Sequence, residues 1–402
     1  MEKDITLHQY LSQENQAWAR QMAGKIEAKL LVVRERSSHK IPSCAIDGIH
    51  DNKAAGNTSL SGISGKSYWT NGFWAGIMWL LYHETKDDRY AEIARHTEGV
   101  LDECVLDFYG LNHDIGYMWL PSAVLDHKLT GNPDALRRGL LAADLLAGRF
   151  NPGGNYIRAW DGEAWDGFCT PCVPKMNTAG VAIIDCMLNL PLLYWASEQT
   201  GDPRFRSIAM KHADKVMQYF VRQDGSVIHI VEFDPETGAL IRDYGGQGYE
   251  KGSSWTRGQA WGLYGFVSSY EHTGKKEYLA AAEKIAAYFI AHIPEDGLIP
   301  SDFCQPKTPD IQDDIAAAAA SSGLLELAKQ VPEHRERYLK AAIRMLRALD
   351  EESSDWSAKT DGITLRGTMA YHAPGQNMNY VYADYFFIEA VLKLTGSNIR
   401  VW

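Results

Sequence analysis

The sequence predicts an all-α fold in which six helical hairpins close into a ring, an (α/α)6 toroid. A turn motif that opens a helix recurs along the chain, and an amphipathic helix follows each copy. A helix that is apolar on most faces, as buried helices are, precedes each copy. Helical hairpins that recur along a chain in this way stack into arrays. An open solenoid is the alternative, but the last hairpin keeps a buried pattern rather than a polar cap, which favours closure.

The recurring turn joins a residue that ends one helix, usually glycine, to an acidic or proline-containing start of the next. Its copies begin at Thr85 (TKDDRY), Thr130 (TGNPDA), Thr200 (TGDPRF) and Thr273 (TGKKEY), with a weaker copy ending at Tyr338 and a stub at Thr395–Asn398. After each full copy, apolar residues recur on one helical face, as Tyr90, Ala94, Thr97 and Leu101 do. These half-exposed helices are the predicted outer ring.

The predicted inner ring consists of the helices that are apolar nearly all round. They are Gly72–Glu84, a segment after His113, Asn177–Gln199, Ser254–His272, Ile311–Val331 and Asn379–Leu394. A long helix near Leu7–Arg34 supplies the remaining outer partner. Strand-like stretches are limited to Ser226–Phe233 and Leu240–Tyr244, so we expect at most one small β-hairpin. The whole chain, residues 1–402, is predicted to be one catalytic domain.

Long irregular segments lead into the inner helices, whereas the outgoing turns are short. The long segments are Ser37–Asn71, Asn151–Met176, Arg222–Ser253 and Glu352–Met378. One end of the ring therefore carries elaborate loops. Function normally resides in such loops, so we expect the site at this end.

Composition excludes several classes of function. The 402 residues carry 40 basic and 51 acidic side chains, a net charge of −11, which disfavours nucleic acid and anionic membranes as partners. No signal-peptide or membrane-spanning run is present, and the six cysteines are scattered, so we expect a soluble cytoplasmic protein, a monomer or weak homo-oligomer. No phosphate loop, dinucleotide fingerprint or HExxH is found, and Cys169 and Cys172 form a CxxC without a second ligand pair. We therefore expect neither cofactor nor metal.

Two aspartates are the candidate acid groups. Asp185 sits among apolar residues in IIDCMLNL, where removal from water favours the protonated form needed by a general acid. Asp114 follows His113 where a loop enters the second inner helix. Two carboxylates converging at one mouth are the usual equipment for glycoside cleavage. The alternatives are a core Asp185 that caps a loop amide and an Asp114 that is only a helix N-cap.

Other polar and aromatic residues could surround these acids. Arg257, at the start of an apolar helix, needs an anionic partner, either a protein carboxylate or a substrate carboxylate. Gln247 in a glycine-rich loop and His229 on the candidate hairpin offer further hydrogen bonds. The chain has 12 Trp, 20 Tyr and 12 Phe, and aromatic faces at a mouth are typical of sugar sites. Trp69, Phe73 and Trp160 fit this interpretation, although helical spacing of aromatics is equally typical of a core.

The segments HDIGYMW, IRAWDG, IIDCMLNLPLLYWAS, QGY and SSWTRGQAWGLYGF together resemble the unsaturated glucuronyl hydrolases of glycoside hydrolase family 88. The resemblance runs from about Tyr68 to Glu389. It implies an (α/α)6 fold, in agreement with the hairpins, and a particular reaction. Such enzymes remove a C4=C5 unsaturated uronic acid from lyase-generated glycosaminoglycan-type oligosaccharides by hydrating its double bond.

The resemblance also implies roles for individual residues. Asp185 is similar to the general acid/base that protonates C4, and Asp114 to a second essential carboxylate. The remaining matching positions line the subsite for the unsaturated sugar. They are Trp69, Phe73, His113, Trp160, His229, Gln247, Arg257 and Trp261, with Tyr371 added from the segment AYHAPGQNMN.

Two departures from the family pattern concern the aglycone. The segment Asn151–Met176 is longer than usual, and AYHAPGQNMN lacks the Ser-and-Lys pattern that holds a sulfated aglycone, because Ala370, Ala373 and Gly375 cannot provide it. The rival functions are hydration of pectin-derived unsaturated rhamnogalacturonides and, in another class, sugar epimerisation on the same toroid. An epimerase predicts paired histidines on inner helices, whereas His113 and His229 lie in loops. A non-catalytic scaffold predicts no buried acid.

Overall fold

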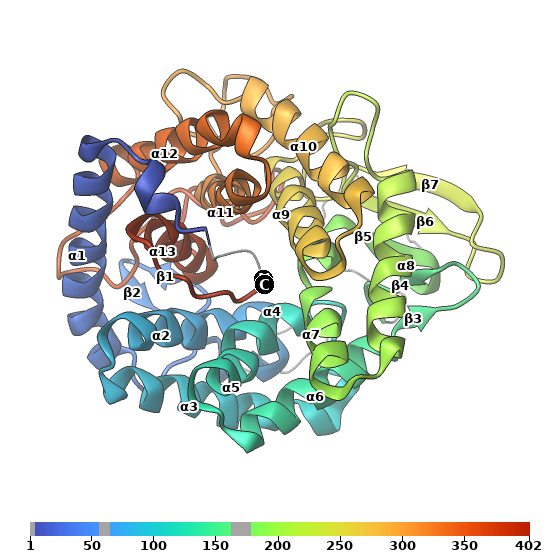
Figure 1. Cartoon of the computed structure of the whole chain (residues 1–402), viewed down its shortest axis with the longest axis horizontal. Helices are drawn as coiled ribbons and strands as arrows, with labels where there is room; N and C mark the ends of the chain where they lie inside the picture. The colour runs from blue at the N-terminus through green and yellow to red at the C-terminus, as the bar shows by residue number, and fades with distance from the viewer. Residues whose placement is uncertain (1–4, 56–64, 162–177) are drawn as a thin grey trace.

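The computed structural model describes residues 5–55, 65–161 and 178–402. Two concentric layers of helices form a closed ring (Figure 1). The inner layer consists of α2 (Gly72–Thr85), α4 (Ile115–Trp119) with α5 (Leu125–Thr130), α7 (Pro191–Thr200), α9 (Thr256–Thr273), α11 (Asp314–Gln330) and α13 (Val381–Thr395). The outer layer consists of α1 (Gln13–Arg36), α3 (Asp88–Asp102), α6 (Pro133–Ala147), α8 (Pro203–Tyr219), α10 (Lys276–Ala291) and α12 (Arg335–Glu352).

The ring closes because α13, the last helix, packs against both α1 and α2. The predicted (α/α)6 toroid is therefore confirmed, and an open solenoid is excluded. The helix expected near Leu7–Arg34 is divided in the structure: a 3-10 turn (Leu7–Tyr10) precedes α1, whose N-cap Ser12 accepts a hydrogen bond from the Asn15 amide at 3.2 Å.

The repeated turns have the predicted chemistry. Inner helices end at left-handed glycines, where a Cβ would be disfavoured. These are Gly131, Gly201, Gly274 and Gly396, with φ between 69° and 101°. The next helix begins at a side-chain cap in three repeats, in which Asp87, Asn132 or Asp202 accepts a hydrogen bond from a backbone amide of the first turn. Each tight turn therefore terminates a buried helix and starts its outer partner.

The segment Asn177–Gln199, predicted as one buried helix, is built differently. It contains a short strand, β5 (Val181–Ile183), a 3-10 helix, η8 (Ile184–Leu188), and only then α7. Two of the three strand residues, Val181 and Ile183, are β-branched, which favours the strand. Pro191 has no N–H for the preceding turn, so the α-helix begins there. Asp185 consequently lies on η8, ahead of the inner helix.

The β structure exceeds the single hairpin that we expected. The hairpin exists as β6 (Ile230–Phe233) and β7 (Leu240–Tyr244), but β5 pairs antiparallel with β6 and makes a three-stranded sheet. Two further ladders join β1 (Ala45–Ile46) to β2 (Ile49–His50) and β3 (Phe150–Asn151) to β4 (Tyr156–Ile157). Two-residue strands leave too little alternation for the sequence to reveal them.

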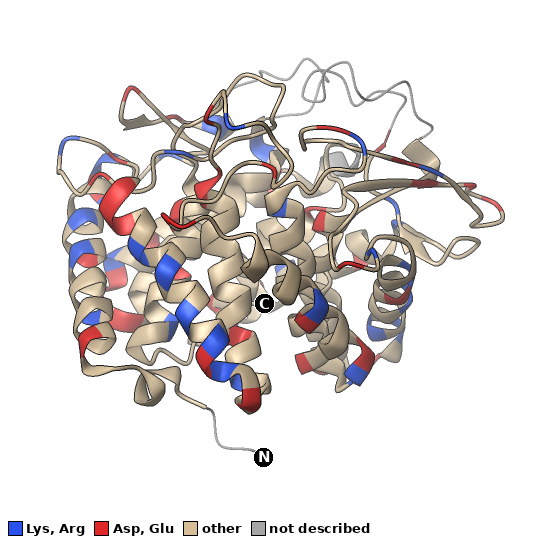
Figure 2. Cartoon of the chain, turned by 90° about the horizontal axis from the view of Figure 1, so that it is seen from above, with Lys and Arg blue, Asp and Glu red and all other residues tan. Residues whose placement is uncertain are grey.

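The long connections gather at one end of the ring, shown uppermost in Figure 2. The opposite end carries the short turns. Aromatic rings fill the axis between them: the Trp402 ring stacks on Phe386 at 5.8 Å and contacts Tyr117 at 5.7 Å and Phe73 at 6.3 Å. Within the described residues, no helix combines the length and apolarity needed to cross a bilayer.

Candidate active site

Asp114 and Asp185 approach each other at the loop-bearing end, from α4 and η8 respectively. Asp114 occupies the N-cap position of α4, but its side chain makes no capping hydrogen bond. The Asp114 backbone amide is instead satisfied by Asn112 Oδ1 at 2.7 Å. The two carboxyl side chains are 12% and 14% exposed. The simple N-cap interpretation of Asp114 is therefore excluded, and its carboxyl faces the site.

The proximity of the two acids changes their protonation. Burial, together with the negative charge of Asp185, raises the pKa of Asp114 well above its ordinary value. Two carboxyls in a poorly solvated site do not ionise together, because each disfavours the charge of the other. Asp114 therefore retains its proton at a pH where an exposed aspartate would have lost it. From the sequence we expected burial to favour the protonated form of Asp185 and did not extend this expectation to Asp114.

Each acid has a histidine beside it. His229 Nε2 lies 3.4 Å from Asp185 Oδ1, and His229 Nδ1 accepts the Gln247 backbone N–H at 3.0 Å. Because Nδ1 is an acceptor, the hydrogen of the neutral ring is on Nε2, toward Asp185. His113 Nε2 lies 3.5 Å from Asp114 Oδ1, and burial lowers the pKa of His113 well below its ordinary value. His113 is thus a neutral ring, and one histidine nitrogen lies beside each acid.

Several polar atoms at this point lack protein partners. Among the described residues, the buried atoms without a hydrogen bond include both ring nitrogens of His113, His229 Nε2 and Asp185 Oδ1. Leaving such atoms unpaired costs about 1–3 kcal/mol each. Their concentration around two carboxyls is typical of a site that a polar ligand completes.

Arg257 finds its anionic partner within the protein. Its Nη1 donates to Asp313 Oδ2 and to the Thr368 carbonyl, both at 2.6 Å, and its Nη2 donates to the Met369 carbonyl at 2.6 Å. Gln247 Nε2 donates to the same Met369 carbonyl at 2.7 Å. The two side chains therefore anchor the segment that leads to Tyr371, whose amide donates to the Gln247 carbonyl at 2.9 Å.

The aromatic candidates differ in exposure. Phe73 and Trp261 are 0% and 1% exposed and belong to the aromatic core of the axis. Trp69 is half-buried and contacts the Tyr117 ring at 5.5 Å. Trp160 is half-buried beside the His113 ring at 6.3 Å. Burial favours a supporting role for Phe73 and Trp261, whereas the half-buried Trp69 and Trp160 retain a face that can meet a sugar.

Three residues at the site escaped the sequence interpretation. Asp313 caps α11 by accepting the Ile315 backbone N–H, and it also pairs with Arg257. Tyr117 and Asn189 lie in apolar segments that resemble a core, yet the Tyr117 hydroxyl donates to the Asp185 carbonyl at 3.2 Å. The available signal was spacing, because Asn189 follows Asp185 by one helical turn.

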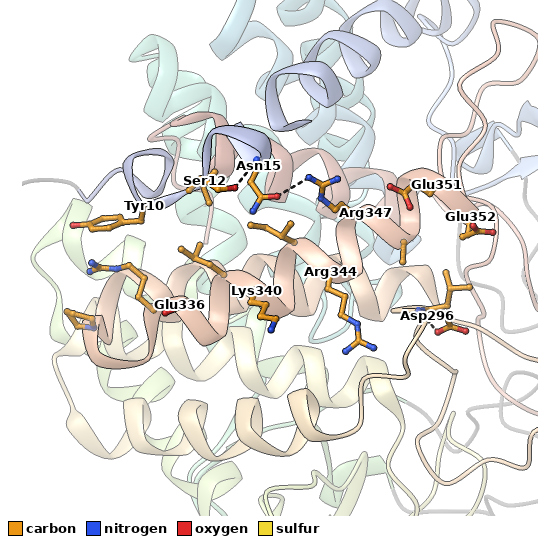
Figure 3. A pocket seen from close by; sticks show the side chains of 17 residues that line it. Tyr10, Ser12, Asn15, Asp296, Glu336, Lys340, Arg344, Arg347, Glu351 and Glu352 are labelled. Carbon is orange, nitrogen blue, oxygen red and sulfur yellow. Dashed lines mark hydrogen bonds between the residues drawn. The ribbon is translucent and has the colours of Figure 1, made fainter. Parts of the chain in front are cut away.

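A large cavity lies away from these residues. About 1190 Å³ in volume, it separates α12 from the segment that starts α1 (Figure 3). Arg347, on its wall, donates to Asn15 Oδ1 at 3.0 Å. Among the described residues, no group of three or more His, Cys, Asp or Glu is arranged to hold a metal ion. Cys169 and Cys172 lie outside the described residues.

Comparison with known proteins agrees with this chemistry. Residues 49–271 match the model of Glycosyl Hydrolase Family 88. The unsaturated glucuronyl hydrolase of Bacillus sp. (strain GL1) is 38% identical over 343 residues, 83% of this chain and 88% of that protein. The unsaturated chondroitin disaccharide hydrolase of Streptococcus pyogenes serotype M1 is 33% identical, over 81% of this chain and 80% of that protein.

Solved structures show the same relationship. The crystal structure of the Bacillus sp. GL1 unsaturated glucuronyl hydrolase aligns with a TM-score of 0.81 at 34% identity, covering 95% of this chain and 98% of that chain. The Streptococcus agalactiae unsaturated glucuronyl hydrolase aligns with a TM-score of 0.84 at 28% identity, covering 98% and 94%. Family model, relatives and fold agree, and the chain therefore belongs to glycosyl hydrolase family 88 and is a glycoside hydrolase.

Proposed function

We propose that the protein is an unsaturated glucuronyl hydrolase. It removes a Δ4,5-unsaturated uronic acid from the non-reducing end of glycosaminoglycan-type oligosaccharides produced by lyases. The observation that carries the proposal is the pair Asp114 and Asp185, which is poorly solvated and in which the pKa of Asp114 is raised. Relatives named as unsaturated glucuronyl and unsaturated chondroitin disaccharide hydrolases support the substrate class.

The double bond of such a sugar is a vinyl ether, so one well-placed acid is sufficient to start its hydration. Asp185 donates a proton to C4, and the positive charge that develops at C5 is shared with the ring oxygen. A water molecule then adds its oxygen to C5 and returns a proton to Asp185. The product is a hemiketal at C5. Ring opening leaves a C5 ketone, and the hemiacetal at C1 then expels the aglycone alcohol.

The neighbouring groups give each step its direction. His229 Nε2 lies 3.4 Å from Asp185 Oδ1, and the ring beside the acid restricts its orientation. Asp114, whose pKa is raised by burial and by the charge of Asp185, holds a proton beside Asp185 in the resting site. The sugar is surrounded by the aromatic faces of Trp69, Trp160 and Tyr371. His113 provides a polar contact to it, whereas Gln247 and Arg257 hold the polar backbone of the segment that leads to Tyr371.

The aglycone preference follows from the segment beside Tyr371. From Gly367 to Met378 the chain contains no Lys or Arg, and the one histidine there, His372, has its Nε2 2.7 Å from the Tyr249 carbonyl oxygen. A sulfate needs a cation or several N–H donors. We therefore propose that the protein acts on unsulfated disaccharides at least as well as on 6-sulfated ones.

A spectroscopic assay tests the proposed function. Purified protein is incubated with unsaturated disaccharides from hyaluronan, chondroitin, heparin and pectin digests while the ultraviolet absorbance of the conjugated double bond is followed. We expect the wild type to remove the absorbance of the glycosaminoglycan disaccharides and Asp185→Asn to leave it unchanged. Loss only on the pectin fragments would assign the protein to rhamnogalacturonide hydration. Retention of absorbance on every substrate would contradict the proposal.

A further inference from the structure

Asn189 lies between the two segments that carry the carboxyls. Its Nδ2 donates to Asp114 Oδ1 at 3.4 Å and to the Asp185 backbone carbonyl at 3.2 Å. Its Oδ1 accepts the Tyr117 backbone N–H at 2.7 Å. One side chain thus connects α4, which begins beside Asp114, to η8, which carries Asp185.

The orientation of this amide is determined by its surroundings. The Tyr117 N–H needs an acceptor, so it selects the oxygen of Asn189 and directs the NH2 group toward Asp114 and the Asp185 carbonyl. The reverse orientation would bring the oxygen against two other oxygens. Asn189 is 0% exposed, so water does not supply an alternative partner.

The backbone makes room for this contact. A Cβ built at Gly116 would lie 2.6 Å from Asn189 Cα and 2.6 Å from Asn189 Oδ1, closer than real Cβ atoms approach. Residue 116 must therefore lack a side chain if Asn189 is to reach Tyr117 and Asp114. The close packing leaves Asn189 one position, and a fixed position is what a catalytic pair requires of its support.

We propose that Asn189 is a positioning residue that fixes the Asp114 carboxyl relative to Asp185, so that one proton is held at a defined place between them. The proposal rests on the proposed function, since it assigns Asn189 a part in that reaction. Asn189 itself does not exchange a proton. It acts by holding Asp114 and by donating to its charged form.

Other charged and titratable groups also act on Asp114. Asp185 and the Cys186 thiol lie on η8, His113 and Tyr117 flank Asp114 in its own segment, and Arg149 acts from the end of α6. Arg149 is occupied by Asp161 at 2.6 Å and by backbone carbonyls. Asn189 is therefore the neutral donor whose removal changes Asp114 without changing the net charge.

The test compares Asn189→Ser, Asn189→Asp and Gly116→Ala in the full chain. Asn189→Asp keeps an acceptor for Tyr117 but replaces the donor by a third carboxyl beside Asp114, whereas Gly116→Ala displaces an intact Asn189. We expect kcat for an unsaturated disaccharide to fall about 100-fold, the effect of a misplacement of about 1 Å, while KM changes much less. In Asn189→Ser the limb of the pH–rate profile that reports Asp114 should move to higher pH, because a donor to the carboxylate is lost.

Asn379→Asp is the matched control, because Asn379 is also buried and also donates to an aspartate, Asp384, at 3.0 Å. It should reduce stability while the folded fraction keeps the wild-type kcat and pH profile. If the Asn189 variants lose activity only in proportion to their folded fraction, raise KM alone, or leave the pH limb in place, the inference is wrong.

Failure of the proposed function is distinguishable from failure of this inference. If the wild type leaves every disaccharide unchanged, the proposed function is wrong. The role of Asn189 is then tested by infrared titration of the Asp114 carboxyl. Spectra of the wild type and of Asn189→Ser are each subtracted from the spectrum of the same protein carrying Asp114→Asn. An upward shift of the Asp114 midpoint in Asn189→Ser supports the inference, and an unchanged midpoint overturns it.

Discussion

His229 Nε2 lies 3.4 Å from Asp185 Oδ1, and the backbone amide of Gln247 fixes which ring nitrogen carries the hydrogen. The orientation of the histidine ring is therefore set by a loop rather than by a second acid. In the proposed mechanism, Asp185 gives up its proton to a carbon and regains it from water.

The first prediction concerns this contact. His229→Ala should lower kcat about 100-fold, because Asp185 loses the group that orients it. His229→Gln, which still offers an N–H, should recover part of the loss. Steady-state kinetics on an unsaturated disaccharide provide the measurement. His272→Ala serves as the control, because His272 is also largely buried but pairs with Glu198; an equal loss of kcat there would contradict the assignment.

The second prediction concerns pH and stability. Burial raises the pKa of Asp114, so the folded protein holds this proton more tightly than the unfolded chain does. The resulting stabilisation is complete below the unfolded value of about 4 and declines as pH rises through the raised pKa. Asp114→Asn cannot ionise and should lose less stability than the wild type between about pH 5 and about pH 8. Thermal melts at both pH values measure the difference; identical slopes would show that Asp114 ionises freely.

The third prediction concerns the pair Arg257 and Asp313, which is 2% and 0% exposed. Asp313→Asn keeps the cap of α11 but leaves a buried guanidinium uncompensated, which should cost about 3–5 kcal/mol of unfolding free energy. The KM for substrate should also rise, because the segment leading to Tyr371 is anchored by Arg257. Denaturant unfolding gives the stability. Asp144→Asn, in an exposed pair with Arg204, should change it by less than about 1 kcal/mol.

The fourth prediction concerns the aglycone. With no cation between Gly367 and Met378, a 6-sulfate should not raise kcat/KM above that of the unsulfated chondroitin disaccharide. Parallel progress curves on the two disaccharides provide the comparison. A tenfold preference for the sulfated one would mean that cations from another segment line this side of the site.

The helical ring was predictable because its signals are local and repeated. The turns at Gly131, Gly201 and Gly274 end one helix and start the next by capping chemistry that depends on neighbouring residues only. Strand β5 was missed because Val181–Ile183 is short, and its pairing with β6 depends on residues about fifty positions away. Non-local pairing of this kind leaves no periodicity in the strand itself.

The candidate site was predictable only in part, for a similar reason. Asp185 and Asp114 are noticeable because an acid beside apolar residues needs an explanation. Asn189 and Tyr117 resemble core residues in the sequence, and only the packing of η8 against α4 shows that they bridge the acids. Asp313 caps its helix through a local contact, but its ion pair with Arg257 joins residues far apart in the chain.

The central claim is that a proton is delivered to C4 from one side of the sugar. The most direct measurement is the reaction in D2O, followed by NMR at C4 of the released uronic acid within the first turnovers. The account predicts one deuterium at C4 on a single face for the wild type, and no product from Asp185→Asn. Direct displacement at the anomeric carbon would release the unsaturated sugar with its double bond intact, and any later uptake of deuterium would show no facial preference. That result would contradict the hydration mechanism.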